Sequence, residues 1–467
     1  MLKFDIAAFF FGRAVGGKLN MSAAEAFGTH RANGPADLSP VETFGEIFGD
    51  NTMIELIRNA RGGADLMLWD GKQQVSGECI SHGGNSYAGA RLDRSVLRQL
   101  ILPKTCAPHS STRDLLGDIC ALMIDLVDLD QKQAGLLARL VLDSAIVDVL
   151  PIAPALVITG SDMTRGSRLM TLLHCLCRHP LSLTGVTPAR LCSLPSGGRF
   201  TLLITQSTVS KSLKQLLDDV SVLDSKIPVG GRLIDLFGLQ VLRCDCLPLV
   251  RSGQQRTIEI RLNATGKMLR RFDSSMQQRI ADEFQARLLG FRRANLFAAG
   301  RIQFDASRLD MTLRMLAASL AAATPDEQEL QDEVVDLLRD DDNERRSERW
   351  TDPKSVACEA VLVAYDGKPG ESIYVGELAQ IAHSILLRRQ AEDPEVSPGE
   401  LGKVLRALGI KTQPRDAKGI KLLLSDDLAQ HARSLCREFG GPQVDKKRYK
   451  ADRSRTSSNS IDPRIVV

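Results

Sequence analysis

Aliphatic strand-like segments alternate with amphipathic helices through the middle of the chain. The segments lie at 155–159, 200–204, 240–244 and 257–262, and the apolar positions between them recur with the period of a helix. Near-continuous aliphatic strands are typical of parallel sheets that are buried on both faces. The pattern therefore predicts an α/β fold whose core is a mostly parallel sheet with flanking helices.

A different pattern precedes this core. Apolar and polar residues alternate over 64–92, and Asp70-Gly71 interrupts the alternation with a pair typical of a hairpin turn. We expect a three-stranded antiparallel meander in a small α/β domain, with Trp69 as a packing residue rather than a ligand platform. Two helices rich in aliphatic residues, between 111 and 148, then lead into the core.

Beyond the core, residues 353–440 show the order helix, strand, helix, helix, hairpin, helix. A capping serine, a proline at the first helical position and an acidic residue at the third make Ser397-Pro398-Gly399-Glu400 a strong helix start. This order is typical of a winged helix, which places one helix in the major groove of duplex DNA and a hairpin wing on the backbone. The alternative is a winged helix that binds protein or oligomerises, with an ordinary solvated basic face. The residues expected to contact DNA are Lys403, Arg406, Lys411, Arg415, Lys418 and Lys421.

Shifts in these patterns divide the chain into six segments. We predict a mobile N-terminal segment (1–43), the meander domain (44–110), the helical lead-in with the α/β core and a helical extension (111–325), a charged connector (326–352), the winged helix (353–440) and a disordered basic tail (441–467). The connector is interpreted as a solvated helix and linker.

Composition limits the partners of the chain. A net charge of +3 is too small to indicate a polyanion partner for the whole protein, so a nucleic-acid site needs a local basic patch. Aromatic residues make up 4% of the chain, which argues against stacking on single strands or sugars. Ten cysteines without a CxxC pair indicate reduced thiols in a cytoplasmic protein. No segment approaches the ~20 apolar residues of a membrane helix, so no membrane contact is predicted.

Two clusters of metal-ligand residue types are not predicted to bind metal. Residues 174–179 contain two histidines and two cysteines, but positions two apart on a helix point in different directions. Cys244 and Cys246 share a strand face without a second pair to complete a tetrahedral set. No resident metal or cofactor is expected.

The segment Gly160-Ser-Asp-Met-Thr-Arg-Gly-Ser167 follows the first strand of the core and has the outline of a phosphate-binding loop. Such a loop needs backbone amides around the phosphates, a lysine for their charge and a hydroxyl on magnesium. With Gly160 as the first glycine, Arg165 stands at the second glycine, Gly166 at the lysine and Ser167 at the hydroxyl. If the alignment is shifted so that Gly166 stands at the second glycine, Ser167 stands at the lysine position. Neither alignment therefore supplies a lysine.

The acidic pair that should follow the next buried strand is also absent, because residues 201–204 run into Thr205-Gln206. Loss of both lysine and metal ligand should remove useful hydrolysis. Three alternatives stay open: a turn without ligand, a nucleotide or anion site without hydrolysis at the helix N-terminus, and catalysis with Arg165 or Arg168 replacing lysine. The residues of this vestigial site are Gly160, Thr164, Arg165, Gly166, Ser167, Arg168, Thr205 and Gln206.

Residues from about 112 to 300, and more loosely the last domain, resemble the P-loop helicase and primase-helicase proteins of phages, plasmids and integrative elements. The resemblance is carried by 154–160, by the helix ending at 176–180, by 201–204 and by 256–262. It implies a P-loop-type fold, and it places Arg256 before the last strand, near a nucleotide site that faces another subunit. The residues most diagnostic of activity have changed, so the resemblance implies a catalytically degenerate relative.

These observations predict a non-hydrolysing P-loop-like scaffold that binds duplex DNA through its winged helix, in mobile-element replication or a related bacterial system. A protein partner or a homo-oligomer is expected. One alternative is a weak DNA-stimulated ATPase or helicase-like enzyme, and the other is a purely protein-binding structural subunit.

Overall fold

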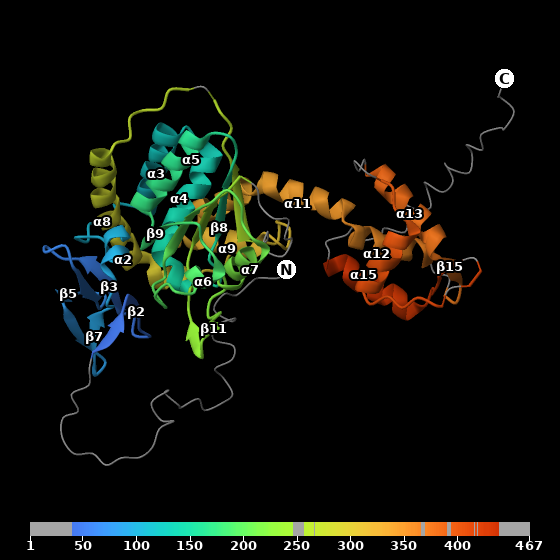
Figure 1. The fold of residues 1–467 in the computed structure, drawn as a ribbon, viewed down its shortest axis with the longest axis horizontal. Coiled ribbons are helices and arrows are strands. Elements are labelled where there is room, and N and C mark those ends of the chain that lie inside the picture. The colour runs from blue at the N-terminus through green and yellow to red at the C-terminus, as the bar shows by residue number, and fades with distance from the viewer. Residues whose placement is uncertain are drawn as a thin grey trace, which may run out of the picture. The chain divides into compact units, whose positions relative to one another are not determined.

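A computed structural model of the chain describes residues 40–245, 256–265, 267–365, 369–389, 394–414, 416–417 and 419–438. These residues divide into two compact units, with the boundary between Arg339 and Asp340 (Figure 1). The predicted basic tail and most of the predicted mobile N-terminal segment lie outside the described residues.

The N-terminal strands form two small sheets rather than one meander. Ala64–Trp69 and the next strand do form a hairpin across Asp70, but the second strand stops at Gly77 and the chain then enters the other sheet. The strands expected to form one meander are therefore divided between two sheets. The predicted mobile segment also ends earlier than residue 43, since β1 pairs with β7. The sheets have the orders β1-β7-β6 and β2-β3-β4-β5, with β1 Val41–Thr43, β2 Gly45–Ile47, β3 Met53–Arg58, β4 Ala64–Trp69, β5 Gln74–Gly77, β6 Cys79–His82 and β7 Asn85–Gly89.

A five-stranded parallel sheet forms the centre of the first unit, which confirms the predicted α/β core. The order of its strands is β14-β8-β13-β10-β9. The sequence patterns did not predict β9, whose five residues begin with proline, or the hairpin of β11 and β12 around Gly230-Gly231. The strands are β8 Ala155–Thr159, β9 Pro180–Thr184, β10 Thr201–Thr205, β11 Ile227–Val229, β12 Arg232–Ile234, β13 Gln240–Arg243 and β14 Thr257–Arg261.

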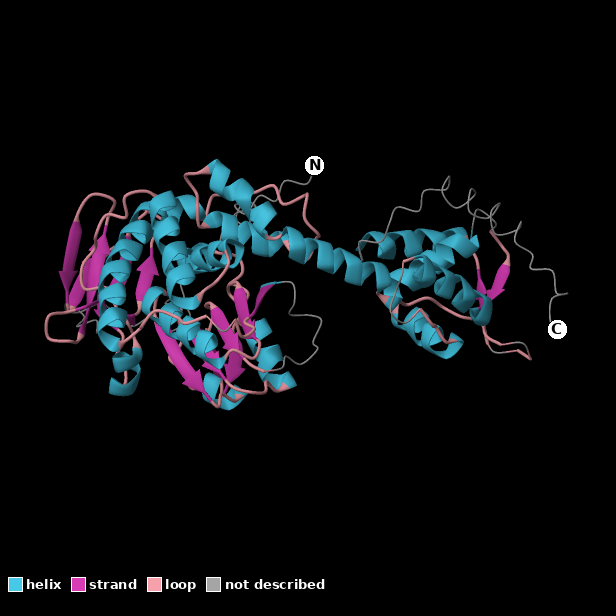
Figure 2. Ribbon diagram, turned by 90° about the horizontal axis from the view of Figure 1, so that it is seen from above, coloured by secondary structure: helices cyan, strands magenta, loops and turns pink. Residues whose placement is uncertain are grey.

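Helices cover both faces of this sheet, as its aliphatic strands predicted. Leu156, Ile158 and Val241 belong to an apolar cluster with α3, α4, α5, α8 and α9, while Val157 and Leu242 belong to a second cluster with α7 and the N-terminal strands. Figure 2 shows those strands as a separate group beside the helices. The helices of the unit are α2 Arg94–Gln99, α3 Thr112–Val127, α4 Gln131–Ile146, η1 Val147–Val149, α5 Met163–Leu176, α6 Pro188–Leu191, α7 Lys211–Asp219, α8 Ser274–Ala299, α9 Arg314–Ala322 and α10 Gln328–Leu337.

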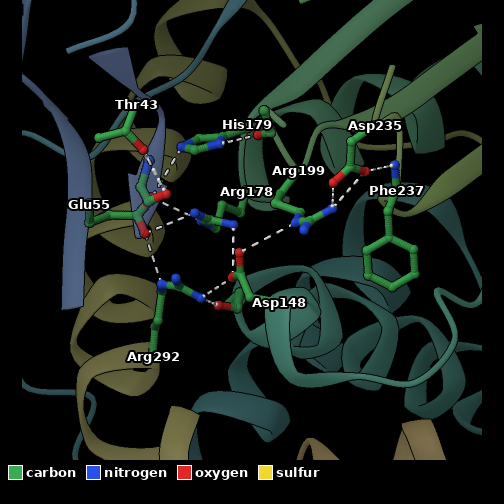
Figure 3. A network of polar contacts seen from close by, with 12 residues as sticks. Thr43, Glu55, Asp148, Arg178, His179, Arg199, Asp235, Phe237 and Arg292 are labelled. Carbon is green, nitrogen blue, oxygen red and sulfur yellow. Dashed lines mark hydrogen bonds and ion pairs between the residues drawn. The ribbon is translucent and has the colours of Figure 1, made fainter. Parts of the chain in front are cut away.

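A buried network of charged side chains joins β3 to the α/β core (Figure 3). Glu55 is 2% exposed and accepts two hydrogen bonds of 2.9 Å from Arg178, between α5 and β9. Arg292 of α8 lies 2.8 Å from the same carboxylate. Asp148 in η1 accepts from Arg178 at 3.2 Å and from Arg292 at 2.6 Å. Two carboxylates and two arginines thus fasten the N-terminal strands to the core.

Trp69 adds a second contact between the strands and the core. Its ring is partly buried against the main apolar cluster, and the guanidinium of Arg293 in α8 lies 4.2 Å from its centroid. A cation over an indole face is attracted by the ring quadrupole. Trp69 is thus a packing residue, as its position beside the Asp70-Gly71 turn suggested.

The connector predicted over 326–352 is helical, and its first half belongs to the core. Val334 and Leu338 are fully buried in the main cluster of the first unit, because apolar residues spaced four apart put one face of α10 inward. Helix α11, Arg339–Thr351, is the charged stretch of the connector and has no such apolar face. The connector is therefore shorter than predicted.

The second unit consists of helices around one apolar cluster and a two-stranded antiparallel sheet. Ser397 and Glu400 form the predicted capping box at the start of α14. After that helix, Gln413 N–H donates to the Lys421 carbonyl at 2.8 Å, and Asp416 bridges Gly419, so the chain turns back as a short hairpin. The elements are α12 Pro353–Tyr365, β15 Ser372–Tyr374, α13 Val375–Arg388, α14 Pro398–Ala407, β16 Lys421–Leu423 and α15 Asp426–Glu438. Among the described helices of the whole chain, none is long and apolar enough to span a membrane.

Candidate functional site

A pocket lies at the carboxyl ends of β8, β10 and β13. It brings together predicted site residues from separate segments, namely Gly160 and Gly166 with Thr205 and Gln206. In open parallel sheets ligands bind beyond the strand ends, where the connections of neighbouring strands leave in opposite directions. Here β8 leads towards β9 at one edge of the sheet, whereas its neighbour β13 leads to β14 at the other. The pocket therefore occupies the position at which an α/β sheet binds ligands.

The pocket is much smaller than a nucleotide site. Its cavity volume is about 70 Å³, whereas small-molecule pockets span ~300–1,000 Å³. The pocket as it stands is therefore too small for a nucleotide.

Helix α5 begins at Met163, so the second half of the predicted loop is helix. Its N-cap is Asp162, whose carboxylate accepts from the Arg165 backbone N–H at 2.9 Å. An anion at a helix N-terminus is stabilised by the free amides and by the helix dipole. Asp162 supplies that anion from within the chain, at the place where a phosphate would bind.

Gly160 is required by backbone packing. Its φ is 109°, and a Cβ built on it would lie 2.2 Å from the carbonyl oxygen of Leu262. The Asp162 N–H donates to that carbonyl at 3.0 Å, and Leu262 N–H donates to Thr159 at 2.8 Å. The glycine therefore allows the chain after β14 to approach the turn, and one turn amide is already bonded there.

Neither arginine of the predicted loop contributes its charge to the pocket. Arg165 is 6% exposed, and its guanidinium donates to the carbonyls of Val127 at 2.8 Å, Asn263 at 2.9 Å and Asp128. Arg168 donates to the carbonyl of Arg270. Arg165 and Arg168 thus hold surrounding chain segments to α5. Thr164 is exposed and is not a lining residue.

The cation in the pocket is Arg243, at the end of β13, which sequence reasoning did not select. Its Nη1 donates to Ser167 Oγ at 2.8 Å and its Nη2 to the Met163 carbonyl at 3.2 Å. A Cβ on Gly166 would meet Arg243 Nε at 2.8 Å. Arg243 therefore lies over Gly166 and engages the Ser167 hydroxyl. The one sequence signal for Arg243 was its position as an arginine at the end of an aliphatic strand.

The end of β10 supplies amide groups to the pocket. The Gln206 side chain accepts from Val186 N–H at 3.0 Å and donates to the Thr208 carbonyl at 3.1 Å. The carboxylates among the lining residues are Asp162 and Asp245, of which Asp162 caps α5. Within the described ranges, no group of three histidine, cysteine or acidic side chains is placed to hold a metal ion.

Arg256 lies outside the pocket. Its Nη1 donates to Ser221 Oγ at 2.5 Å and to the Asp218 carbonyl at 3.2 Å, at the end of α7. Burial lowers the pKa of its guanidinium. Arg256 is therefore directed into its own subunit.

The predicted DNA contacts divide into two groups in the second unit. Lys403 and Arg406 are exposed on α14, one turn apart, and Lys411 is exposed where the hairpin begins. Lys421 is engaged internally, since its ammonium lies 2.6 Å from Asp416 and 5.0 Å from the Tyr374 ring; hydrogen bonds to these two groups raise its pKa. The two other predicted contacts, Arg415 and Lys418, lie outside the described residues.

No protein-family model matches the chain, and no curated protein matches it. Solved structures match it at low identity. The apo structure of the NrS-1 C-terminal region is 12% identical, covering 80% of this chain and 97% of that chain with a TM-score of 0.35. JCV helicase is 12% identical, covering 49% and 74% with a TM-score of 0.18. Drosophila ORC bound to DNA is 12% identical, covering 77% and 96% with a TM-score of 0.17.

Proposed function

We propose that the protein is a non-hydrolysing scaffold whose second unit binds duplex DNA as a winged helix, while its degenerate P-loop-like core assembles with a protein partner or with other copies. We place this scaffold in replication of a mobile element or a related bacterial system. The observation that carries the proposal is the pair of exposed cations, Lys403 and Arg406, on the helix that precedes the hairpin.

The order of elements in the second unit supports a winged helix. Helix α14 follows α13 and precedes the hairpin, and β16 pairs with β15 from before both helices. In helix-turn-helix proteins the second helix of the pair enters the major groove. The corresponding helix here is α14, and its exposed side chains determine what it can bind.

Charge on α14 favours DNA over an apolar protein surface. Lys403 and Arg406 are three residues apart and therefore share a face, and both are exposed. Lys411 adds a third exposed cation at the start of the hairpin. Lysine and arginine contacts to phosphates supply most non-specific affinity for DNA through counterion release.

The absence of hydrolysis is supported by the pocket. Phosphoryl transfer needs cations on the phosphates, a metal site and a positioned water. Here Asp162 takes the helix N-terminus, Arg243 is bonded to Ser167, and glutamine follows β10 where an acidic pair would hold the metal. Hydrolysis would require several of these groups to rearrange at once.

The double variant Lys403→Ala/Arg406→Ala is expected to bind duplex DNA about tenfold more weakly at ~0.1 M salt, with the slope of log K against log salt reduced by roughly one for each phosphate that is no longer neutralised. Gel shift or fluorescence anisotropy over a salt series measures both quantities. Lys354→Ala/Arg388→Ala is the matched control, since it removes the same charge from exposed positions on α12 and α13. Equal affinities for all three proteins would contradict the assignment to α14 and favour a protein-binding module.

We expect phosphate release from ATP to stay at background with magnesium, with or without duplex DNA. The reason is that Asp162 and Arg243 occupy the places of phosphate and lysine. The malachite green assay measures the rate. Release that required magnesium and vanished in Arg168→Ala would instead identify the ATPase alternative, whereas DNA binding without release is the result that the scaffold proposal requires.

A further inference from the structure

Strand β5 forms an open edge of the N-terminal strands. It is the last strand in the order β2-β3-β4-β5, and it lies at the outer margin of those strands in Figure 1. Gln74, Val75 and Ser76 are all exposed. An edge strand presents a row of backbone N–H and C=O groups with which another strand can pair. Strand β5 is therefore a surface to which a further strand can be added.

The pairing of β5 with β4 determines which of its backbone groups point outwards. The turn between the strands closes with a hydrogen bond of 3.3 Å from the Asp70 N–H to the Gln73 carbonyl, and the register continues unbroken from there. Hydrogen-bonded and non-hydrogen-bonded pairs alternate along an antiparallel ladder. Counted from the turn, Val75 directs its N–H and C=O groups to β4, whereas those of Gln74 and Ser76 point to the open edge.

The side chain of Val75 continues an apolar face of β4. Val75 lies opposite Leu68, and residues opposite each other in a ladder project to the same side of the sheet. Leu68 packs against the second apolar cluster of the unit, whereas Val75 is 54% exposed at the edge. A strand that pairs with β5 would therefore bury an apolar side chain as well as backbone groups, at ~25 cal/mol for each Å² of apolar surface.

The charges on either side of β5 are complementary to a second copy of the same strand. Lys72, in the turn before the strand, and Glu78, in the bend after it, are both exposed, and each is three residues from Val75. In an antiparallel pair of two β5 strands centred on Val75, each Lys72 stands beside the partner's Glu78. A pair centred on Gln74 would instead bring Asp70 beside the partner's Glu78, and like charges oppose pairing.

We propose that two copies of the chain pair antiparallel through β5, with Val75 of one copy opposite Val75 of the other, so that their sheets become continuous. The inference rests on the part of the proposed function in which copies of the chain assemble, and it names the surface. Gln74 and Ser76 exchange backbone hydrogen bonds across the interface, and the two Val75 residues form a non-hydrogen-bonded pair with Cα atoms ~4.5 Å apart. One short strand pair buries little surface, so the dimer should be weak and depend on concentration.

The first test reverses charges in the full-length chain. Sedimentation velocity over a concentration series measures the dimer, and Lys72→Glu should weaken it about tenfold, because two attractions per dimer become repulsions. Lys72→Glu/Glu78→Lys exchanges the charges and should restore the affinity. Lys211→Glu, at an exposed position of α7, is the control and should leave it unchanged. A chain that stays monomeric at every concentration, or a dimer that Lys72→Glu does not weaken, would overturn the proposal and leave this edge to an extended segment of another protein.

The second test determines the register by cross-linking, in a Cys79→Ser background that removes an exposed thiol next to the strand. Val75→Cys should form a covalent dimer on oxidation, since Cα atoms ~4.5 Å apart lie within reach of a disulfide. Gln73→Cys should form none, because the proposed register separates its two copies by four positions along the strand, roughly 14 Å. Equal cross-linking of both variants would contradict the register.

Gel shift with duplex DNA on the same proteins separates this inference from the proposed DNA site. A monomeric chain that still loses DNA affinity in Lys403→Ala/Arg406→Ala would overturn the strand pairing and leave the winged helix in place. A dimer whose DNA affinity is unchanged in that variant would support the strand pairing and contradict the assignment to α14.

Discussion

Replacing Glu55 with alanine is expected to lower the free energy of unfolding of the first unit by about 3–5 kcal/mol, the cost of leaving a buried ion pair without one partner. Glu55 is 2% exposed and contacts both Arg178 and Arg292. Arg292 is 1% exposed, and its Nη2 makes no hydrogen bond with the described groups. Without Glu55, Asp148 alone would balance two buried guanidinium groups.

The lowered pKa values of Glu55 and Asp148 agree with this expectation, and they determine the pH range over which the stabilisation is lost. Burial raises the pKa of both carboxyls, but Arg178 and Arg292 outweigh it, so the pKa of Glu55 lies well below its usual value and that of Asp148 falls to about 2. A group with a lowered folded pKa stabilises the fold above its unfolded pKa and loses that contribution as pH falls. The network should therefore weaken from about pH 4.5 down to about pH 2.

Urea unfolding followed by Trp69 fluorescence measures the loss, in a Trp350→Phe background that leaves one tryptophan. Glu78→Ala is the matched control, since Glu78 is exposed just after β5. Adding Arg178→Met to Glu55→Ala should cost less than the sum of the two single changes, because it removes one of the stranded charges. Equal stabilities of Glu55→Ala and Glu78→Ala would show that the network contributes nothing.

The parallel sheet could be predicted from sequence because burial on both faces leaves aliphatic strands with no alternation. Glu55 could not be placed by the same reasoning. One carboxylate in Met53-Ile-Glu-Leu-Ile-Arg58 looks like the solvent face of a strand, and its partners, Arg178 and Arg292, are distant in sequence. A buried charge can be predicted only when its partners are known, and tertiary structure determines those partners.

The structure brings several residues of the predicted site together in one pocket, but the roles of these residues could not be read from their order in the chain. Gly160 resembles a phosphate-loop glycine, yet the close carbonyl of Leu262 explains it. Arg165 looks like a replacement for lysine, yet it bonds backbone carbonyls on neighbouring segments. Arg243 reaches Ser167 from a strand that ends 76 residues later in the chain. Motif spacing identifies the turn, whereas the direction of each side chain depends on what packs around it.

Removing the carboxylate of Asp143 is expected to stabilise the protein at neutral pH. Asp143 is fully buried in α4, and neither carboxylate oxygen has a hydrogen-bond partner among the described groups. Arg139, one turn earlier, instead directs its Nη2 to the Leu330 carbonyl and to Glu333, both at 2.9 Å. An unsatisfied buried polar group costs ~1–3 kcal/mol, so Asp143→Leu should raise the free energy of unfolding by a similar amount if the side chain fits.

The sign of the pH dependence distinguishes Asp143 from Glu55. Burial raises the pKa of the Asp143 carboxyl well above its usual value, with Arg139 opposing. Above the unfolded pKa the folded state therefore holds a proton that the unfolded state has lost, so the stability contributed by this group falls as pH rises. The slope reaches about 1.4 kcal/mol per pH unit until the folded pKa is passed.

Asp143→Asn keeps the shape of the side chain and removes its titration, so the free energy of unfolding should lose this downward slope above about pH 4. Urea unfolding at a series of pH values measures it, again through Trp69. Asp114→Asn, at an exposed position in the first turn of α3, should keep the slope of the unmodified protein. Parallel pH profiles for Asp143→Asn and the unmodified protein would mean that Asp143 is ionised in the fold, and its apolar surroundings would then have to supply a partner for the charge.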